Sequence, residues 1–320
     1  MKNNGFLSLC YHYIREKKQN ESFSRILGTE ISEFKNQMKM LSENFQILDL
    51  EQIENFSKKE MKLNKTGMLI TFDDGLSDHY TAAKILHELD IRGVFFIPTC
   101  ILENEPANPM IIHYCIARYG VEKFVNEYEN LRIKHDIPSN FRLTYNKQHD
   151  NPWKKIDSIK KLFKYQLSNK KSRQVLLDIF ENTLKRDYSN PVEIIHLTKN
   201  QIDEIVQMGH SIGVHTHTHI SIAPSKLSSQ EFEYEIKKPK ELLENTFKTK
   251  VFSMSFPFGE KQDCLTSAEL FEKTNLFQFA FTVDPILNTN NINPLQYGRY
   301  QPQSKENTED LKQFLDTLVR

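Results

Sequence analysis

Apolar residues gather along the chain in short continuous runs that alternate with helix-like patterns. The runs at 6–13 and 94–98 are apolar almost throughout, which is typical of parallel strands buried on both faces of a sheet. Between such runs apolar residues recur at helical spacing, and Ser32 is placed to cap the first helix. This order predicts parallel strands joined by right-handed crossovers. The expected strands are 6–13, 45–50, 68–72, 94–98, 211–215, 251–255 and 277–283.

The alternation stops between Thr99 and about His196. Helical patterns at 111–128, 153–167 and 173–184 fill this span, with many lysines and no convincing strand. A structureless loop of this length is improbable in a compact domain. We therefore expect an all-helical insertion.

The chain is thus expected to divide into a first α/β part at 1–102, a helical insertion at 103–195 and a second α/β part at 196–320. The insertion follows the strand at 94–98, at the carboxyl end where α/β barrels build their ligand sites. Two placements fit this position. The insertion is either a lid that narrows an open groove into a pocket, or a dimerisation element packed elsewhere.

The α/β pattern resumes with two helix-start signals. Capping-box patterns at 198–201 and 228–231 predict one helix that ends at Gly209 and a longer one that Pro239 kinks. An amphipathic pattern at 309–318 predicts a closing helix.

Composition narrows the class of protein. The 320 residues contain 42 Lys+Arg and 42 Asp+Glu, so no basic field is present to gather nucleic acid or anionic lipid. No apolar run approaches the roughly 20 residues of a membrane helix, and no secretory h-region follows the first residues. The four cysteines form no CxxC pair, which favours reduced thiols in the cytoplasm.

Two adjacent carboxylates, Asp73 and Asp74, stand where the strand at 68–72 runs into Gly75. At such a strand end both can reach one pocket, one as a metal ligand and the other as a general base. The alternative is an ordinary strand-to-helix turn, with Asp74 capping a helix near Ser77.

Three histidines, His215, His217 and His219, follow the strand at 211–215. In a straight strand they would line one solvated side, with the outer two about 13 Å apart. If the chain turns after His215, the i, i+4 pair can hold one metal ion. An i, i+2 pair that uses His217 is the remaining option.

Together these stretches resemble the polysaccharide deacetylase (NodB homology) family, also called carbohydrate esterase family four. The family's first motif, Thr-Phe-Asp-Asp-Gly, occurs unchanged at 71–75, and its second, His-(Ser/Thr)-x-x-His, is matched at 215–219. The Phe-Pro-Phe-Gly stretch at 256–259 lies where the third motif is expected. The resemblance covers about 1–100 and 196–300 and implies a distorted (β/α) barrel.

The resemblance also implies roles for single residues. Asp74, His215 and His219 are implied to hold a divalent metal, usually zinc, and Asp73 to be the general base that takes a proton from water. His217 is not a ligand in the family. The substrate contacts expected beside this site are Pro257, Phe258 and Arg299.

Two features depart from the family. The arginine that usually precedes the third-motif proline by two residues is Ser255 here, and the late histidine that acts as general acid has no counterpart after His219. Arg299 is a candidate to replace the missing charge. His12 is the favoured substitute acid, although a buried histidine bonded to a backbone carbonyl is an equal reading.

We therefore expect a cytoplasmic, metal-dependent deacetylase that acts on an N-acetylated sugar in a glycan or glycan precursor, with no nucleic-acid partner and no membrane span. Two alternatives stay open. One is a hydrolase of the same fold that acts on a non-sugar amide, and the other is a catalytically silent carbohydrate-binding domain. The sequence leaves open the sugar, the metal and the oligomeric state.

Overall fold

A computed structural model describes residues 5–16, 22–264 and 275–319, and its centre is a curled sheet. In these residues the sheet has eight strands in the order β7-β6-β5-β4-β3-β1-β8, with β2 paired to the start of β3. The strands are parallel except that β8 runs antiparallel to β1. The strands are β1 Gly5–Tyr11, β2 Gln46–Ile47, β3 Gly67–Phe72, β4 Gly93–Ile97, β5 Ser211–Val214, β6 Ser253–Ser255, β7 Phe279–Phe281 and β8 Asn288–Thr289.

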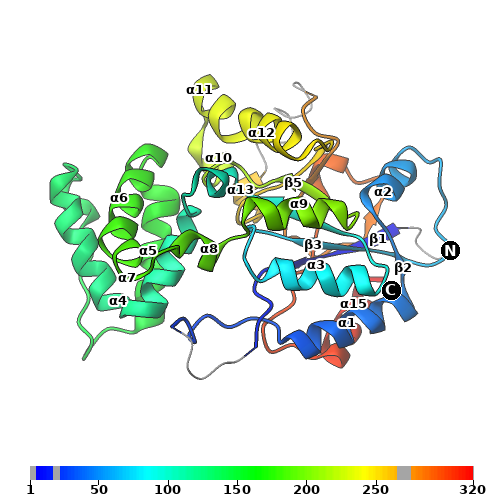
Figure 1. Cartoon of the computed structure of the whole chain (residues 1–320), viewed down its shortest axis with the longest axis horizontal. Helices are drawn as coiled ribbons and strands as arrows, with labels where there is room; N and C mark the ends of the chain where they lie inside the picture. The colour runs from blue at the N-terminus through cyan, green and yellow to red at the C-terminus, as the bar shows by residue number, and fades with distance from the viewer. Residues whose placement is uncertain (1–4, 17–21, 265–274, 320) are drawn as a thin grey trace.

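The expected distorted (β/α) barrel is confirmed, because helices surround a sheet that curls into a half-barrel (Figure 1). Residues 297–300 bridge its two sides. Tyr297 exchanges backbone hydrogen bonds of 2.8 and 3.0 Å with the β7 region, and Tyr300 exchanges two of 2.8 Å with β1. This segment carries Arg299 between β7, which it follows closely in sequence, and β1, which lies at the other end of the chain.

Strand alternation decides which side chains face the interior of the barrel. Phe6, Leu69 and Phe96 belong to a buried apolar cluster that Tyr297 joins. Because alternate residues of a strand share a face, Asp73 continues the side of Leu69. The same rule turns Arg299 to the side of Tyr297, so the interior brings the carboxylate and the guanidinium together.

Helices cover the sheet, and the one that begins at Leu50 adds Leu50, Ile53 and Phe56 to the interior apolar cluster. Within the described residues no helix is both long enough and apolar enough to cross a membrane. The covering helices are α1 Ile31–Asn44, α2 Leu50–Ser57, α3 His79–Glu88, α9 Lys199–Gln207, α10 Ile222–Ser225, α11 Ser229–Phe232, α12 Lys238–Phe247, α13 Lys261–Cys264 and α15 Thr308–Val319, with the short η5 Pro294–Gln296.

The span at 103–195, all of which the structure describes, contains helices and no strand. Its helices stand to one side of the sheet (Figure 1), and α4 packs against α5 and α6. The elements that follow β4 are η1 Thr99–Glu103, α4 Asn108–Lys134, η2 Ser139–Phe141, α5 Pro152–Lys161, η3 Leu162–Gln166, α6 Asn169–Asn182, α7 Leu184–Asp187 and α8 Pro191–Ile195.

The predicted strand at 45–50 is wrong in length, because only β2 is extended and α2 begins at Leu50. Asp49 starts that helix with a capping box in which it accepts from the Gln52 N–H at 2.9 Å, and the Gln52 side chain accepts from the Asp49 N–H at 3.0 Å. Two reciprocal hydrogen bonds stabilise the helical start over an extended chain. The sequence analysis missed this capping box.

The capping boxes at Thr198 and Ser228 are confirmed. The helix after Ser228 is nevertheless not one kinked rod but α11, a π-helical turn η4 Glu233–Lys237, and α12. Pro239 lies in the first turn of α12, where its missing N–H does no harm. Just before it, the Lys238 N–H bonds to the Glu233 carbonyl, five residues back.

Candidate active site

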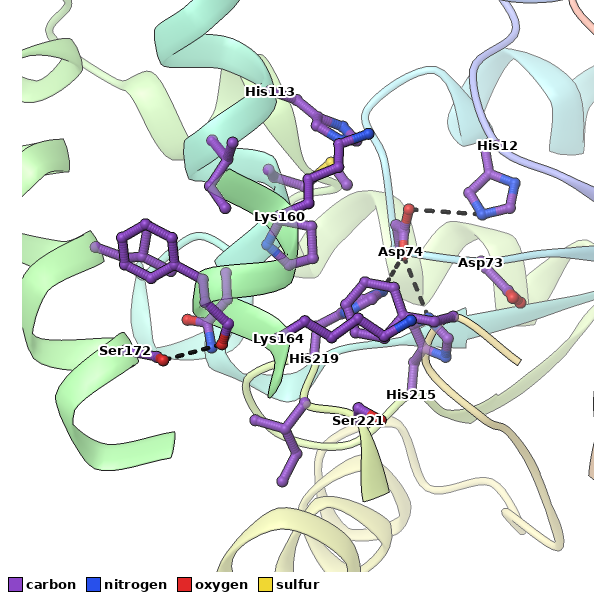
Figure 2. A pocket seen from close by; sticks show the side chains of 18 of the residues that line it. His12, Asp73, Asp74, His113, Lys160, Lys164, Ser172, His215, His219 and Ser221 are labelled. Atoms are coloured by element: carbon purple, nitrogen blue, oxygen red, sulfur yellow. Dashed lines mark hydrogen bonds and ion pairs between the residues drawn. The ribbon is translucent and has the colours of Figure 1, made fainter. Parts of the chain in front are cut away.

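A cavity of about 380 Å³ opens where several parallel strands end. Residues that follow β1, β3, β5, β6 and β7 line one side, and helices of the insertion line another (Figure 2). This is the edge at which α/β barrels build ligand sites. The residues on the barrel side that matter below are His12, Asp73, Asp74, His215, His219 and Phe258.

Asp74, His215 and His219 meet at the bottom of this cavity (Figure 2). The Nε2 atoms of His215 and His219 lie 3.2 and 2.9 Å from Asp74 Oδ1. His215 Nδ1 lies 3.0 Å from the carbonyl oxygen of Ser255, which can only accept. That contact places the proton on Nδ1 and leaves the Nε2 lone pair facing Asp74.

This cluster is built on unusual backbone. Asp74, Thr216, His219 and Phe258 all have positive φ angles, of 77°, 56°, 64° and 66°. Such angles are uncommon outside glycine and gather at functional sites. The positive φ of Thr216 turns the chain just after β5, so the histidines do not line a straight strand. α3 begins only at His79, so Asp74 is not its cap.

The donor set fits a divalent metal ion. Atoms of Asp74, His215 and His219 lie within 4.8 Å of one another. Asp74 Oδ1 is buried and accepts no hydrogen bond, which is costly unless a cation is present. Two imidazole nitrogens and one carboxylate oxygen are a ligand set used by zinc in catalytic sites with an open position.

The histidine loop is fixed by two polar side chains. Thr216 Oγ1 accepts from the His219 N–H at 2.9 Å. Glu235, in the π-helical turn, accepts from the backbone N–H groups of His217 and Thr218 at 3.1 and 2.9 Å, and from the Thr218 hydroxyl at 2.7 Å. Glu235 is only 5% exposed. It therefore determines the path of the loop between the two candidate ligands.

We predict that Glu235→Leu lowers the metal affinity of the protein about 10-fold or more, because residues that orient metal ligands are typically worth 10–100-fold. Competition with a chromophoric chelator on the metal-free protein measures this affinity. Glu233→Gln is the matched control in the same helical turn, since the Glu233 side chain is half-exposed and accepts from Lys237 rather than from the histidine loop. Equal affinities in the two variants would contradict the prediction.

Asp73 is held by a two-pronged contact with Arg299. Arg299 Nη1 and Nη2 donate to its two carboxylate oxygens at 2.8 and 2.7 Å, and the Ser255 hydroxyl donates at 3.0 Å. Burial opposes the charged form of Asp73, but the Arg299 guanidinium outweighs it and holds the pKa of Asp73 well below its usual range. Asp73 is therefore ionised at neutral pH.

Ser255 contacts both the candidate base Asp73 and the candidate ligand His215. Its hydroxyl lies 2.6 Å from His215 Nδ1 and donates to Asp73. The position of the missing family arginine is thus occupied by a residue that contacts both a candidate ligand and the candidate base. Arg299 supplies the positive charge from another strand-like segment, as the sequence analysis proposed for it.

The structure corrects two predicted substrate contacts. Arg299 is fully buried behind Asp73, so it holds that carboxylate and does not face the cavity. Pro257 is buried and is not among the cavity-lining residues. Phe258 does line the cavity, and its ring packs edge-on against His219 with centroids 4.8 Å apart.

His217 and His12 are placed differently. His217 lies outside the cavity, with Nδ1 2.9 Å from Thr99 Oγ1, and burial lowers its pKa to about 4. His12 lines the cavity, is 26% exposed, and has Nε2 3.8 Å from Asp74 Oδ2.

The sequence analysis missed Glu235 and the insertion residues Lys160, Lys164 and His113 that line the cavity. Nothing local in the sequence distinguishes these charged residues from solvated ones.

Comparison of the sequence with known proteins finds one family. The polysaccharide deacetylase family model matches residues 170–273. This span includes the candidate ligands His215 and His219 but neither Asp73 nor Asp74. No curated protein sequence matches the chain.

Solved structures show the same fold. The deacetylase PplD of Streptococcus pyogenes, solved in complex with acetate, is 16% identical with a TM-score of 0.59, covering 98% of this chain and 99% of that one. A Bacillus cereus polysaccharide deacetylase is 17% identical with a TM-score of 0.56, covering 99% and 70%. IcaB of Ammonifex degensii is 14% identical with a TM-score of 0.56, covering 98% of each chain.

Proposed function

We propose that this chain, whose resemblance to polysaccharide deacetylases is confirmed by the family match and the shared fold, hydrolyses the acetamido group of an N-acetylated sugar in a glycan or glycan precursor. One observation carries the proposal. Asp73, Asp74, His215 and His219 converge at the bottom of one cavity, with Asp73 kept apart from the other three by its contact with Arg299.

In this proposal Asp74, His215 and His219 hold a divalent metal, zinc being our first choice because of the nitrogen-rich ligand set. Such an ion acts as a Lewis acid toward a carbonyl oxygen and lowers the pKa of water. The contribution of the protein is to keep His215 in the tautomer that offers Nε2, through the Ser255 carbonyl.

Asp73 accepts the proton of the attacking water in this mechanism. Arg299 and Ser255 orient the carboxylate and keep it unprotonated at neutral pH. A carboxylate paired this tightly is a weak base, so it depends on a water whose pKa is itself lowered. The oxygen of that water forms a bond to the acetyl carbon, the carbon–nitrogen bond breaks, and acetate is released.

His12 gives a proton to the departing amine. It is the partly exposed histidine beside Asp74, and its backbone carbonyl is fixed by His79, whose Nε2 lies 2.9 Å from the His12 oxygen. His79 Nδ1 accepts from the Leu76 N–H at 3.2 Å, so the proton of its neutral ring lies on Nε2 and is donated to His12. Burial lowers the pKa of His79 to about 3, which keeps that ring neutral.

We also propose a reducing, cytoplasmic location, supported by the four cysteines, which are all free and buried. A silent carbohydrate-binding domain is the less favoured alternative, since binding alone gives no reason to hold a buried carboxylate between an arginine and a serine.

The test is acetate release from acetylated mono- and oligosaccharides by the zinc-loaded protein, the chelator-treated protein and the protein reloaded with zinc. We expect release that disappears on chelation and returns on reloading. Release unaffected by removal of bound metal, verified by elemental analysis, would contradict the metal assignment. Binding of sugars without release in every metal-loaded form would favour the silent domain.

A further inference from the structure

The helical insertion forms the part of the cavity that a substrate would meet beyond its acetamido group. His113 of α4, Lys160 of α5 and Lys164 of η3 line the cavity from this side and face the region of Asp74 (Figure 2). Asn169 and Ser172, in the first turn of α6, lie on the same side. We call these five residues the insertion wall.

The charges around the cavity are nearly all paired. Asp73 binds Arg299. Lys164 donates to the buried carboxylate of Asp263 at 3.0 Å, and its ammonium lies 3.9 Å from the centroid of the Phe258 ring. These groups therefore cancel in pairs and leave little net charge of their own.

Asp74 belongs to the candidate metal site, and two other lining charges remain. They are the positive charge of Lys160 and the negative charge of the exposed Glu260. Lys160 makes no ion pair with any residue in the described parts of the chain. Glu260 accepts a hydrogen bond of 2.7 Å from the neutral side chain of Gln262. Glu260 belongs to the barrel side of the cavity. Lys160 belongs to the insertion wall, so the wall carries a positive charge that has no ion-pair partner among the described residues.

Asp157, three residues before Lys160 in α5, offsets part of its charge but forms no ion pair with it. The His113 ring lies beside Lys160 (Figure 2), with Nδ1 3.2 Å from the Tyr13 hydroxyl. Burial, and then the charge of Lys160, lower the pKa of His113 to about 3, so this ring is neutral. Partial desolvation also lowers the pKa of Lys160. The Lys160 side chain is exposed at the cavity wall, where an anionic group can reach its ammonium without displacing an ion-pair partner.

The first turn of α6 adds a smaller effect in the same direction. A helix of 14 residues carries a partial positive charge at its N-terminus. This partial charge adds to the positive charge of Lys160 but would not define an anion site by itself.

We propose that the insertion wall binds an anionic group of the acetylated substrate, a phosphate or a carboxylate attached to or next to the acetamido sugar, with Lys160 as the residue in contact. This inference rests on the proposed deacetylase function and specifies its substrate class. The insertion thereby determines specificity, in addition to enclosing the cavity.

The experiment compares three small sugars that differ in charge. N-acetylglucosamine is neutral, its 6-phosphate carries a phosphate, and N-acetylmuramic acid carries a carboxylate. Binding to the zinc-loaded protein is measured by calorimetry, and kcat and KM for acetate release are measured separately. The variants are Lys160→Gln, Lys160→Glu and the control Lys161→Gln, which changes the next, exposed lysine of α5, a residue outside the cavity lining.

We expect the unsubstituted protein to bind at least one anionic sugar about 10- to 100-fold more tightly than the neutral one, the usual worth of a hydrogen bond to a charged group. Lys160→Gln should remove this preference by raising KM with kcat little changed. Lys160→Glu should reverse it, and Lys161→Gln should retain it. Loss of preference for only one of the two anionic sugars would identify the phosphate or the carboxylate.

Equal binding of the neutral and both anionic sugars by the unsubstituted protein would overturn the inference, whether or not acetate is released. An anionic preference that Lys160→Gln leaves intact would also overturn it. The proposed function fails separately, if the anionic preference is present and depends on Lys160 but no acetate is released from any sugar.

Discussion

Replacing His219 with alanine is expected to remove stoichiometric metal from the protein and to abolish acetate release. His219 offers one of three candidate ligand atoms, with Nε2 2.9 Å from Asp74 Oδ1, and three-ligand catalytic sites have no spare donor. His215→Ala should behave in the same way. Elemental analysis after exhaustive dialysis, alongside acetate release, measures both effects.

His217→Ala is the matched control, because it removes an imidazole from the same five-residue segment. His217 lies outside the cavity and contacts Thr99 and the ring of Tyr234. We expect this variant to lose some thermal stability but to keep its metal. Metal loss in His217→Ala together with metal retention in His219→Ala would show that the i, i+2 pair binds the ion and that the family assignment is wrong.

Much of the barrel could be predicted from short-range pattern. Continuous apolar runs predicted the ends of β1, β3 and β4 to within two residues. A strand that is buried on both faces needs apolar side chains at nearly every position, which makes it easy to recognise. The strand at 45–50 failed for a local reason. The capping box of Asp49 and Gln52 stabilises a helix start inside the apolar run, and helix and strand compete there on nearly equal terms.

The candidate site was predictable where its residues are neighbours in sequence. Asp73 and Asp74 are adjacent and His215 and His219 are four apart, so the members of each pair lie near each other along the chain, and the family resemblance implied their roles. The distance between the two pairs depends on how β3, β4 and β5 adjoin in the sheet. The repeated strand-then-helix pattern predicted parallel strands but did not say which strands adjoin.

The place of Arg299 could not be derived from the sequence. It lies 226 residues from Asp73, and the two meet only because residues 297–300 bridge β7 and β1. A short irregular segment with Tyr297 and Tyr300 has no periodicity that predicts such a bridge. The sequence therefore suggested Arg299 as a replacement charge but assigned it wrongly to the substrate surface.

Helix-borne charges were missed for a different reason. Glu235 and Lys160 stand among many other charged residues on helices, where a solvated side chain is the normal outcome. Only the packing of the π-helical turn against the histidine loop gives Glu235 its three hydrogen bonds. Only the insertion helices bring Lys160 to the cavity.

The second large effect is expected from Asp73→Asn, which should retain metal but lower the rate of acetate release about 10²- to 10⁴-fold, the usual worth of a positioned general base. Asp73 is not part of the group Asp74, His215 and His219 to which we assign the metal, so its loss leaves those three ligands in place. Asp74→Asn, the neighbouring isosteric change, should lose both metal and activity. Metal content and kcat/KM of the two variants test this division of roles.

Asp73→Asn also leaves Arg299 buried opposite a neutral amide. Breaking a buried pair typically costs about 3–5 kcal/mol, although Arg299 keeps its hydrogen bonds to Thr71 and to the Thr282 carbonyl. Thermal unfolding of the metal-loaded variant, together with the double variant Asp73→Asn/Arg299→Met, separates this loss of stability from the loss of the base. If the double variant recovers stability but not rate, the base assignment holds. Full activity of folded Asp73→Asn, or metal loss equal to that of Asp74→Asn, would refute it.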